Sequence, residues 1–209
     1  MKIMKSLKLL SLCFIAVLST VSCSDSKNLK DDTLSSFMLG GIYFINGYGG
    51  LSDVETMMTN AGYTSNSELV SAYSEIFVFP FDKSDSSGAI RILESAWDIN
   101  SKESLLKTTE ELKTREYKYK SWDYARIANN VSMGYAADYL TKEECLSILA
   151  NTLTLAKEKY KDWDTYYSDF EKGRNAWNPD DLEKENFQKL AKTITKGEKS
   201  IYNILPLHN

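Results

Sequence analysis

Residues 141–160 read TKEECLSILANTLTLAKEKY, and this stretch decides how the chain folds. Its apolar residues recur at spacings of three and four, the period of one face of an α-helix. The residues expected to form this buried stripe are Cys145, Leu149, Leu153, Ala156 and Tyr160. Thr141 and Glu144 stand three apart at the start and predict a capping box. We therefore expect a long helix here with one face in the core.

The residues before this stretch predict a second long helix. It is expected to begin at Ser121-Trp122-Asp123, and several of its side chains are small enough to let another helix approach closely. These small residues are Ala125, Ala128, Gly134, Ala136 and Ala137. Because almost no loop separates the two helices, the sequence predicts an antiparallel hairpin.

Further start signals predict that the rest of the chain is helical as well. Ser65 and Glu68 form a second capping-box pattern, and helix starts are also expected at Asn100-Ser101-Lys102-Glu103 and at Asp162. The run Asn178-Pro179-Asp180-Asp181 has a cap, a Pro at the first helical position and then two acids, which predicts another helix start. The fold class is therefore mainly α, a compact helical domain.

Two apolar segments leave the type of structure open. Residues 38–45 fit a buried helix or a buried strand, and a Gly-rich turn follows at residues 47–50. Residues 77–81 are apolar and contain Pro80, so they fit a short strand or an extended buried segment.

The first 22 residues have the pattern of a secretory signal. Lys2, Lys5 and Lys8 precede an apolar run over residues 9–18, which is too short to span a bilayer comfortably. Thr20-Val21-Ser22-Cys23 resembles the lipobox of bacterial lipoproteins, although Thr20 stands where Leu is usual. The resemblance implies that Cys23 is lipidated and becomes the mature N-terminus. The alternative is a plain secretory signal with an incidental Cys.

A lipidated Cys23 would place the protein in the cell envelope, anchored to a bacterial membrane, with the outer membrane favoured. Residues 23–34 are polar and are expected to form a tether. Loss of the leader leaves 22 basic against 29 acidic residues, a formal charge of −7. Such a balance argues against nucleic acid as a partner. We expect the membrane, through the lipid, and another protein to be the partners.

The residue inventory excludes most catalytic chemistry. The single His is His208, and the three Cys are Cys13, Cys23 and Cys145. A Ser-His-Asp triad, a Cys–His dyad or a Cys/His zinc site lacks the residues it needs, so we expect no catalytic residue, no metal and no cofactor. Cys145 lies among apolar residues and is expected to be a buried structural thiol.

One enzymatic alternative remains, because glycoside hydrolysis needs only two carboxylates beside a cleft. The carboxylates with the best local context are Asp98, Asp123, Glu144, Asp162 and Asp164. Each of them also fits the simpler role of a helix cap or first-turn acid.

A series of Trp, Arg and Gly motifs runs from residue 96 to residue 178. They are Trp97-Asp98-Ile99, Trp122-Asp123-Tyr124-Ala125-Arg126, Gly134-Tyr135, Tyr139-Leu140, Glu143-Glu144, Trp163 and Gly173-Arg174-Asn175-Ala176-Trp177. Their order and spacing resemble the domain of unknown function 1266 family of bacterial proteins, with Asp98 where a Gly is more usual. The resemblance implies a helical domain and supplies no activity. It divides the mature chain into residues 35–95, a family-like core at 96–178, and a C-terminal helix and tail at 179–209.

The motifs suggest one cluster of side chains: Trp97, Trp122, Asp123, Arg126, Glu144, Trp163, Arg174 and Trp177. In a structural interpretation Arg126 pairs with Asp123, or across helices with Glu144 or Asp98, and Arg174 forms a second pair beside Trp177. In a functional interpretation the Arg and Trp side chains line a pocket for an anionic or sugar-like ligand. The structural interpretation is the more economical one.

The aromatic content fits a binding role, most simply as a protein-interaction module. The chain has 13 Tyr and four Trp, and such rings are enriched at recognition surfaces. Tyr117, Tyr119, Tyr166 and Tyr167 lie among polar residues and are expected on an exposed or half-buried helix face. A carboxylate-based hydrolase or a sugar-binding protein is the alternative.

Overall fold

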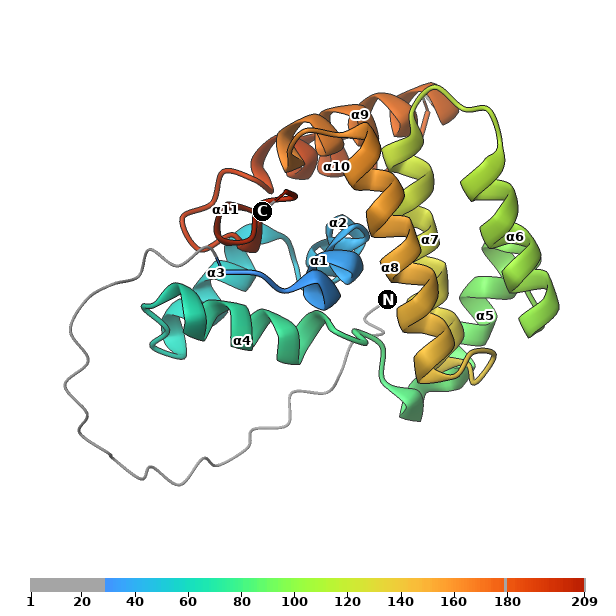
Figure 1. Cartoon of the computed structure of the whole chain (residues 1–209), viewed down its shortest axis with the longest axis horizontal. Helices are drawn as coiled ribbons and strands as arrows, with labels where there is room; N and C mark the ends of the chain where they lie inside the picture. Colours follow the sequence, from blue (N-terminus) through green and yellow to red (C-terminus); the bar gives the residue numbers. More distant parts are fainter. Residues whose placement is uncertain (1–28, 179, 209) are drawn as a thin grey trace.

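The computed structural model describes residues 29–178 and 180–208, and within these ranges it contains helices and no strand (Figure 1). In chain order the elements are α1 (Asp32–Met38), α2 (Gly41–Gly47), α3 (Leu51–Asn60), α4 (Asn66–Phe77), the 3-10 helix η1 (Lys83–Asp85), α5 (Ser86–Trp97), α6 (Lys102–Thr114), α7 (Lys120–Ala136), α8 (Lys142–Lys159), α9 (Trp163–Trp177), α10 (Lys184–Thr193) and α11 (Ile201–Ile204). The expected mainly helical, compact fold is confirmed. None of the described helices has the length and apolar composition needed to cross a bilayer.

Helices α7 and α8 form the predicted antiparallel hairpin (Figure 1). The capping box at the start of α8 is present: the Glu144 N–H donates to Thr141 Oγ1 at 3.2 Å and the Thr141 N–H donates to Glu144 Oε2 at 3.0 Å. Asp138 adopts a left-handed conformation with φ 59°, which reverses the chain between the two helices. The hairpin is therefore encoded by local signals at the turn between its two helices.

The apolar face of α8 lies in the core as expected. Cys145 and Leu149 are fully buried, and Leu153 is 4% exposed. Burial raises the pKa of the Cys145 thiol to about 12, which agrees with a structural thiol. On the other helix of the hairpin, a side chain in place of Gly134 would collide with Leu105 of α6, so the absence of a Cβ lets α6 pack closely.

The α1–α2 region resolves the ambiguous segment at residues 38–45 as two short buried helices. Three tyrosine hydroxyls bind the carbonyls at the break between them. Tyr167 and Tyr202 donate to the Met38 carbonyl oxygen at 2.9 and 2.8 Å, and Tyr166 donates to that of Leu39 at 3.0 Å. The end of α1 can therefore be buried without an unsatisfied carbonyl at these residues.

Residues 77–81 form no strand. Helix α4 includes Phe77, Val78 is extended, and Phe79 has φ 57°. The Phe79 ring packs 4.9 Å from that of Phe37 and 4.3 Å from that of Tyr135, measured between ring centroids. Pro80 disfavours helical backbone at Phe79, so the chain leaves α4 as an irregular segment that is partly buried.

Three helix boundaries differ from the expectations. Helix α1 begins at Asp32, inside the expected tether of residues 23–34, because Asp31 caps it and Leu34 is fully buried. Helix α7 begins at Lys120, and the Ser121 hydroxyl donates to Asp169 Oδ2 at 3.0 Å instead of capping the helix.

The third difference is the helix expected to start at residues 178–181, which does not start there. Asn178 ends α9, its side chain accepts from the Asp180 N–H at 3.1 Å, and α10 begins only at Lys184. The Asn178 side chain thus stabilises a turn between α9 and α10.

Truncating Leu149 or Leu153 to Ala should destabilise the fold by about 2–5 kcal/mol each, because the change removes buried apolar surface and leaves a cavity. Leu106→Ala on α6 is the control, since Leu106 is 39% exposed and should cost well under that amount. Urea denaturation measures all three. Equal, small losses would mean that the α8 face contributes little to the core.

Candidate functional site

Asp123 is the centre of a charge cluster at the start of α7. Its carboxylate is fully buried and is bound by three cationic side chains. Arg115, at the end of α6, donates from Nε at 3.0 Å and also from Nη2. Lys120 Nζ donates at 3.2 Å, and Arg126 Nη2 completes the set. The expected ion pair between Arg126 and Asp123 is therefore present, and Glu144 and Asp98 are not its partners.

Lys120 connects this cluster to the end of α6. Its ammonium group also donates to the carbonyl oxygens of Leu112 at 2.6 Å and of Arg115 at 3.2 Å, where helical carbonyls lack partners within the helix. Burial lowers the pKa of Lys120, and the Asp123 carboxylate opposes this shift. Burial likewise lowers the pKa of Arg126, again opposed by Asp123. The Asp123 carboxylate thus favours the charged form of both side chains, against the effect of burial.

Two tryptophan rings contact the Arg126 side chain, and a third packs on one of them. The Arg126 guanidinium carbon lies 3.5 Å from the ring centroid of Trp122 and 5.3 Å from that of Trp97. The Trp177 ring packs on Trp122 with 5.6 Å between centroids. Trp122 is 3% exposed and Trp177 is 59% exposed. The two stacked rings therefore extend from the buried Arg126 side chain to the protein surface.

Arg174, on α9, forms the second pair that the sequence suggested. Its Nη2 lies 2.5 Å from Asp181 Oδ2 and 3.8 Å from Glu183 Oε2. Its guanidinium carbon is 3.8 Å from the centroid of the Phe187 ring on α10. Arg174 therefore links α9 to the turn and helix that follow.

The structure brings together six of the eight residues of the suggested cluster. Glu144 lies elsewhere, where it caps α8 and pairs with Lys102. Trp163 packs in the core, and its Nε1 donates to the Leu205 carbonyl oxygen at 2.8 Å. Arg115 and Lys120 are members that sequence reasoning missed, although Arg115 is one of only four Arg and Lys120 stands three residues before Asp123.

The positions of Asp98 and of four tyrosines also bear on the motifs. Asp98 has φ 55°, a left-handed conformation that Gly adopts most easily. Tyr117 and Tyr119 are half-buried, as expected, but they lie in the connection between α6 and α7 and not on a helix face. The expectation for Tyr166 and Tyr167 was wrong: both are fully buried, because their hydroxyls bind the carbonyls of the α1–α2 break.

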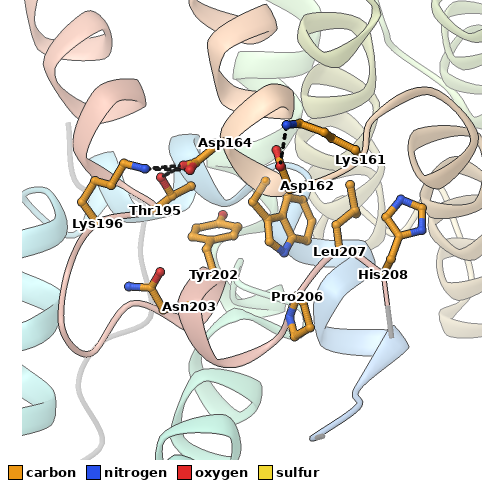
Figure 2. Close-up of a pocket in the computed structure, with 11 residues that line it drawn as sticks. Lys161, Asp162, Asp164, Thr195, Lys196, Tyr202, Asn203, Pro206, Leu207 and His208 are labelled. Carbon is orange, nitrogen blue, oxygen red and sulfur yellow. Dashed lines mark hydrogen bonds and ion pairs between the residues drawn. The ribbon is translucent and has the colours of Figure 1, made fainter.

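A separate open pocket of about 350 Å³ lies between the start of α9 and the C-terminal segment (Figure 2). Two of the carboxylates considered for hydrolysis, Asp162 and Asp164, are on its rim. Asp162 accepts from the Thr165 N–H at 2.7 Å, and this bond lowers its pKa. Lys196 binds both Asp164 oxygens at 2.7 Å and, with Thr195, lowers the pKa of Asp164. A glycosidase acid needs a raised pKa, so this pair does not fit that role.

In the described part of the chain, no group of three or more His, Cys, Asp or Glu side chains is placed to hold a metal ion. The Asp123 cluster cannot hold a metal ion either, because three cationic side chains already surround its one carboxylate. The arrangement stabilises the negative charge of Asp123.

The fold and this site define an all-helical domain with a buried Arg/Lys–carboxylate cluster under a tryptophan stack. Residues 111–207 match the model of a family described as "Protein of unknown function (DUF1266)". The match supports the resemblance seen in the motifs and marks this stretch as a domain of unknown function. It begins within α6, so Trp97 precedes it, and it continues past α11. No curated protein and no solved structure gave a match.

Replacing Arg126 by Met should destabilise the fold by about 3–5 kcal/mol, because it breaks a buried ion pair from one side. Arg115→Met is the matched control at the same carboxylate. Its side chain is 40% exposed, so its removal should cost less than about 1 kcal/mol. Chemical denaturation gives both values. A loss for Arg126→Met no larger than that for Arg115→Met would show that the cluster has no architectural role.

Proposed function

We propose that the protein is an envelope lipoprotein, tethered to a bacterial membrane through Cys23, whose helical domain binds another protein. Cys23 and the leader lie outside the described residues, so the tether rests on the sequence pattern. The single observation that carries the binding role is the exposed apolar surface around Trp177.

We call this surface the Trp177 surface. It is defined by Trp177, Tyr117 and Tyr119, which are linked through ring contacts with Trp122, and by Leu182, five residues after Trp177 in the chain. Trp177 is 59% exposed and the Leu182 side chain is fully exposed; besides them, Leu106 is the one large hydrophobic residue exposed among the described residues. Tyr117 packs 5.9 Å from Trp122 and 5.8 Å from Tyr119, between centroids. The Tyr117 hydroxyl donates to the Gly173 carbonyl oxygen at 3.2 Å, which joins the two tyrosines to α9.

The Trp177 surface has the composition of an interaction hot spot. Trp, Tyr and Arg dominate binding energies at interfaces, and rigid rings lose little entropy when they bind. Trp177 is held by its stacking on the buried Trp122, and a Cβ at Gly173 would lie only 2.8 Å from the Cβ atoms of Trp122 and Tyr119. The close approach of α9 to α7 at Gly173 therefore brings Trp177 into contact with the buried Trp122 ring.

The net charge supports a protein partner over nucleic acid, since acids exceed bases by four in the whole chain. The hydrolase alternative has no comparable support, because both carboxylates at the pocket of Figure 2 are held in the ionised form by bonds to their neighbours.

Lipidation is tested by the variant Cys23→Ala. We expect it to lose metabolic incorporation of a labelled fatty acid, because the thiol that carries the lipid is gone. Cys13→Ala, within the leader, should keep the label. Full labelling of Cys23→Ala would contradict the tether.

Binding is tested with a photoreactive phenylalanine analogue placed at position 177, 182 or, as control, at the exposed position 106. Irradiation in the cells that make the protein should give a discrete adduct from 177 and 182 and none from 106. The adduct from 182 should be lost when Trp177→Ala is added, since the same surface is then damaged. Equal adducts from all three positions, or none from 177 and 182, would end the proposal.

A further inference from the structure

Two buried side chains at the interface between α6 and α7 carry polar atoms that have no hydrogen-bond partner among the described residues. They are the hydroxyl oxygen of Thr109 on α6 and both the amide nitrogen and the amide oxygen of Asn130 on α7. Thr109 is 7% exposed and Asn130 is 1% exposed. Buried polar groups are nearly always hydrogen-bonded, because taking them out of water costs free energy that a partner must offset. These three atoms therefore favour a conformation in which water reaches them.

The two side chains lie at the same level of one interface. Helices α6 and α7 pack on each other and run antiparallel, joined by the short connection at residues 115–119 (Figure 1). Leu105 of α6 lies directly against Gly134 of α7. Thr109 is four residues after Leu105 and Asn130 is four residues before Gly134, so each lies about one helical turn farther along the same contact. Thr109 and Asn130 thus form one unsatisfied polar layer between the two helices.

The other contacts of α6 hold it weakly. It lies at the edge of the molecule and packs mainly against α7 (Figure 1). Its buried residues are Leu105, Thr109 and Leu112, so two leucines supply its buried apolar contact. Its ion pair to α8, between Lys102 and Glu144, is exposed to water. Local opening costs little free energy where little apolar surface is buried.

The charge cluster around Asp123 can persist without α6. Lys120 and Arg126 lie on α7, the same helix as Asp123. Arg115 comes from the end of α6, but its side chain is 40% exposed, so its pair with Asp123 is partly screened by water. The bond from Lys120 to the Leu112 carbonyl oxygen is exchanged for a bond to water when the interface opens. The Asp123 carboxylate therefore keeps two cations when α6 separates.

We infer that α6 opens from α7 as a unit, pivoting on its connections at residues 98–101 and 115–119, while the other helices stay folded. The opening brings water to Thr109 and Asn130. Tyr117 and Tyr119 lie in the second connection, so the same movement displaces two residues of the Trp177 surface. The opening of α6 therefore controls how completely that surface is formed. This inference goes beyond the proposed binding function, and its test needs no partner.

The test is hydrogen–deuterium exchange of the full-length chain, measured by mass spectrometry on peptides from α6 and α8. Helical amides exchange when their hydrogen bonds open, so the exchange rate, corrected for the intrinsic rate of each peptide, reports the opening equilibrium. We expect the amides of α6 to exchange at least about a hundredfold faster than those of α8, because α6 opens locally and α8 is part of the core.

Two threonine variants of nearly unchanged shape show whether the polar layer causes the opening. Thr109→Val removes the unpaired hydroxyl and should slow the exchange of α6 about fivefold or more, because the closed form no longer buries it. Thr152→Val is the matched control, since it removes a buried hydroxyl of α8 that donates to the Ile148 carbonyl oxygen at 2.8 Å. It should change the exchange of α6 by less than about twofold.

Asn130→Leu provides a second variant at the same layer. It replaces the unpaired amide by an apolar group of similar size and should also slow the exchange of α6 about fivefold or more. If Asn130→Leu fails to fold, Thr109→Val and the wild type decide.

Two tyrosine variants test the link to the Trp177 surface. The Tyr117 hydroxyl ties the connection at residues 115–119 to α9 through the Gly173 carbonyl oxygen. Tyr117→Phe should therefore speed the exchange of α6 about fivefold, because this tie opposes the opening. Tyr119→Phe is the control, since the Tyr119 hydroxyl forms no hydrogen bond within the described part of the chain. It should leave the exchange of α6 within about twofold of the wild-type rate.

The inference is overturned if α6 is as well protected as α8, or if Thr109→Val slows its exchange no more than Thr152→Val does. Equal exchange of α6 in Tyr117→Phe and in the wild type would overturn its control of the Trp177 surface. Adducts from positions 177 and 182 together with a well-protected α6 would leave the proposed binding surface standing and remove only the opening. Fast exchange of α6 without any adduct would instead support the opening and remove the proposed partner.

Discussion

A carboxylate shielded from water needs cations around it, and the Asp123 carboxylate is bound by three. Burying this carboxylate without its shielded cations would cost several kcal/mol, so Asp123, Lys120 and Arg126 must be placed together. This requirement fixes the connection from α6 to α7, because Arg115 and Lys120 flank it. It also fixes Arg126 over the Trp122 ring, and through that ring the position of Trp177 at the surface. The positions of the charge cluster and of the aromatic surface therefore depend on each other through direct side-chain contacts.

The features that could be predicted from the sequence are those whose cause is local. The capping boxes of α4 and α8 depend on two residues three apart, and the stripe of α8 depends on helical period, so both appear in the structure as expected. The ion pair between Asp123 and Arg126 is also an i,i+3 contact within one helix. Each of these needs no knowledge of the tertiary fold.

The features that could not be predicted have partners outside their own helix. Tyr166 and Tyr167 follow polar residues, yet carbonyls of Met38 and Leu39 draw their hydroxyls into the core. Asn178 has every local property of a helix cap, but Asp181 is drawn to Arg174 and the next helix starts at Lys184. Arg115 joins Asp123 across a loop, and nothing in its own neighbourhood marks it. Hydrogen bonds and ion pairs between different elements of the fold determine the structure in these cases.

The tyrosine hydroxyls at the break between α1 and α2 have a consequence for the order of folding. Tyr202 is 164 residues beyond Met38, whose carbonyl it binds. Contacts at such separations form late, because the loop between them must first be closed. Until α9 and α11 have been synthesised, the carbonyls of Met38 and Leu39 have no hydroxyl to bind, and the amino-terminal helices cannot be buried at low cost. A nascent chain therefore cannot complete the packing of its amino-terminal helices before Tyr202 has been made.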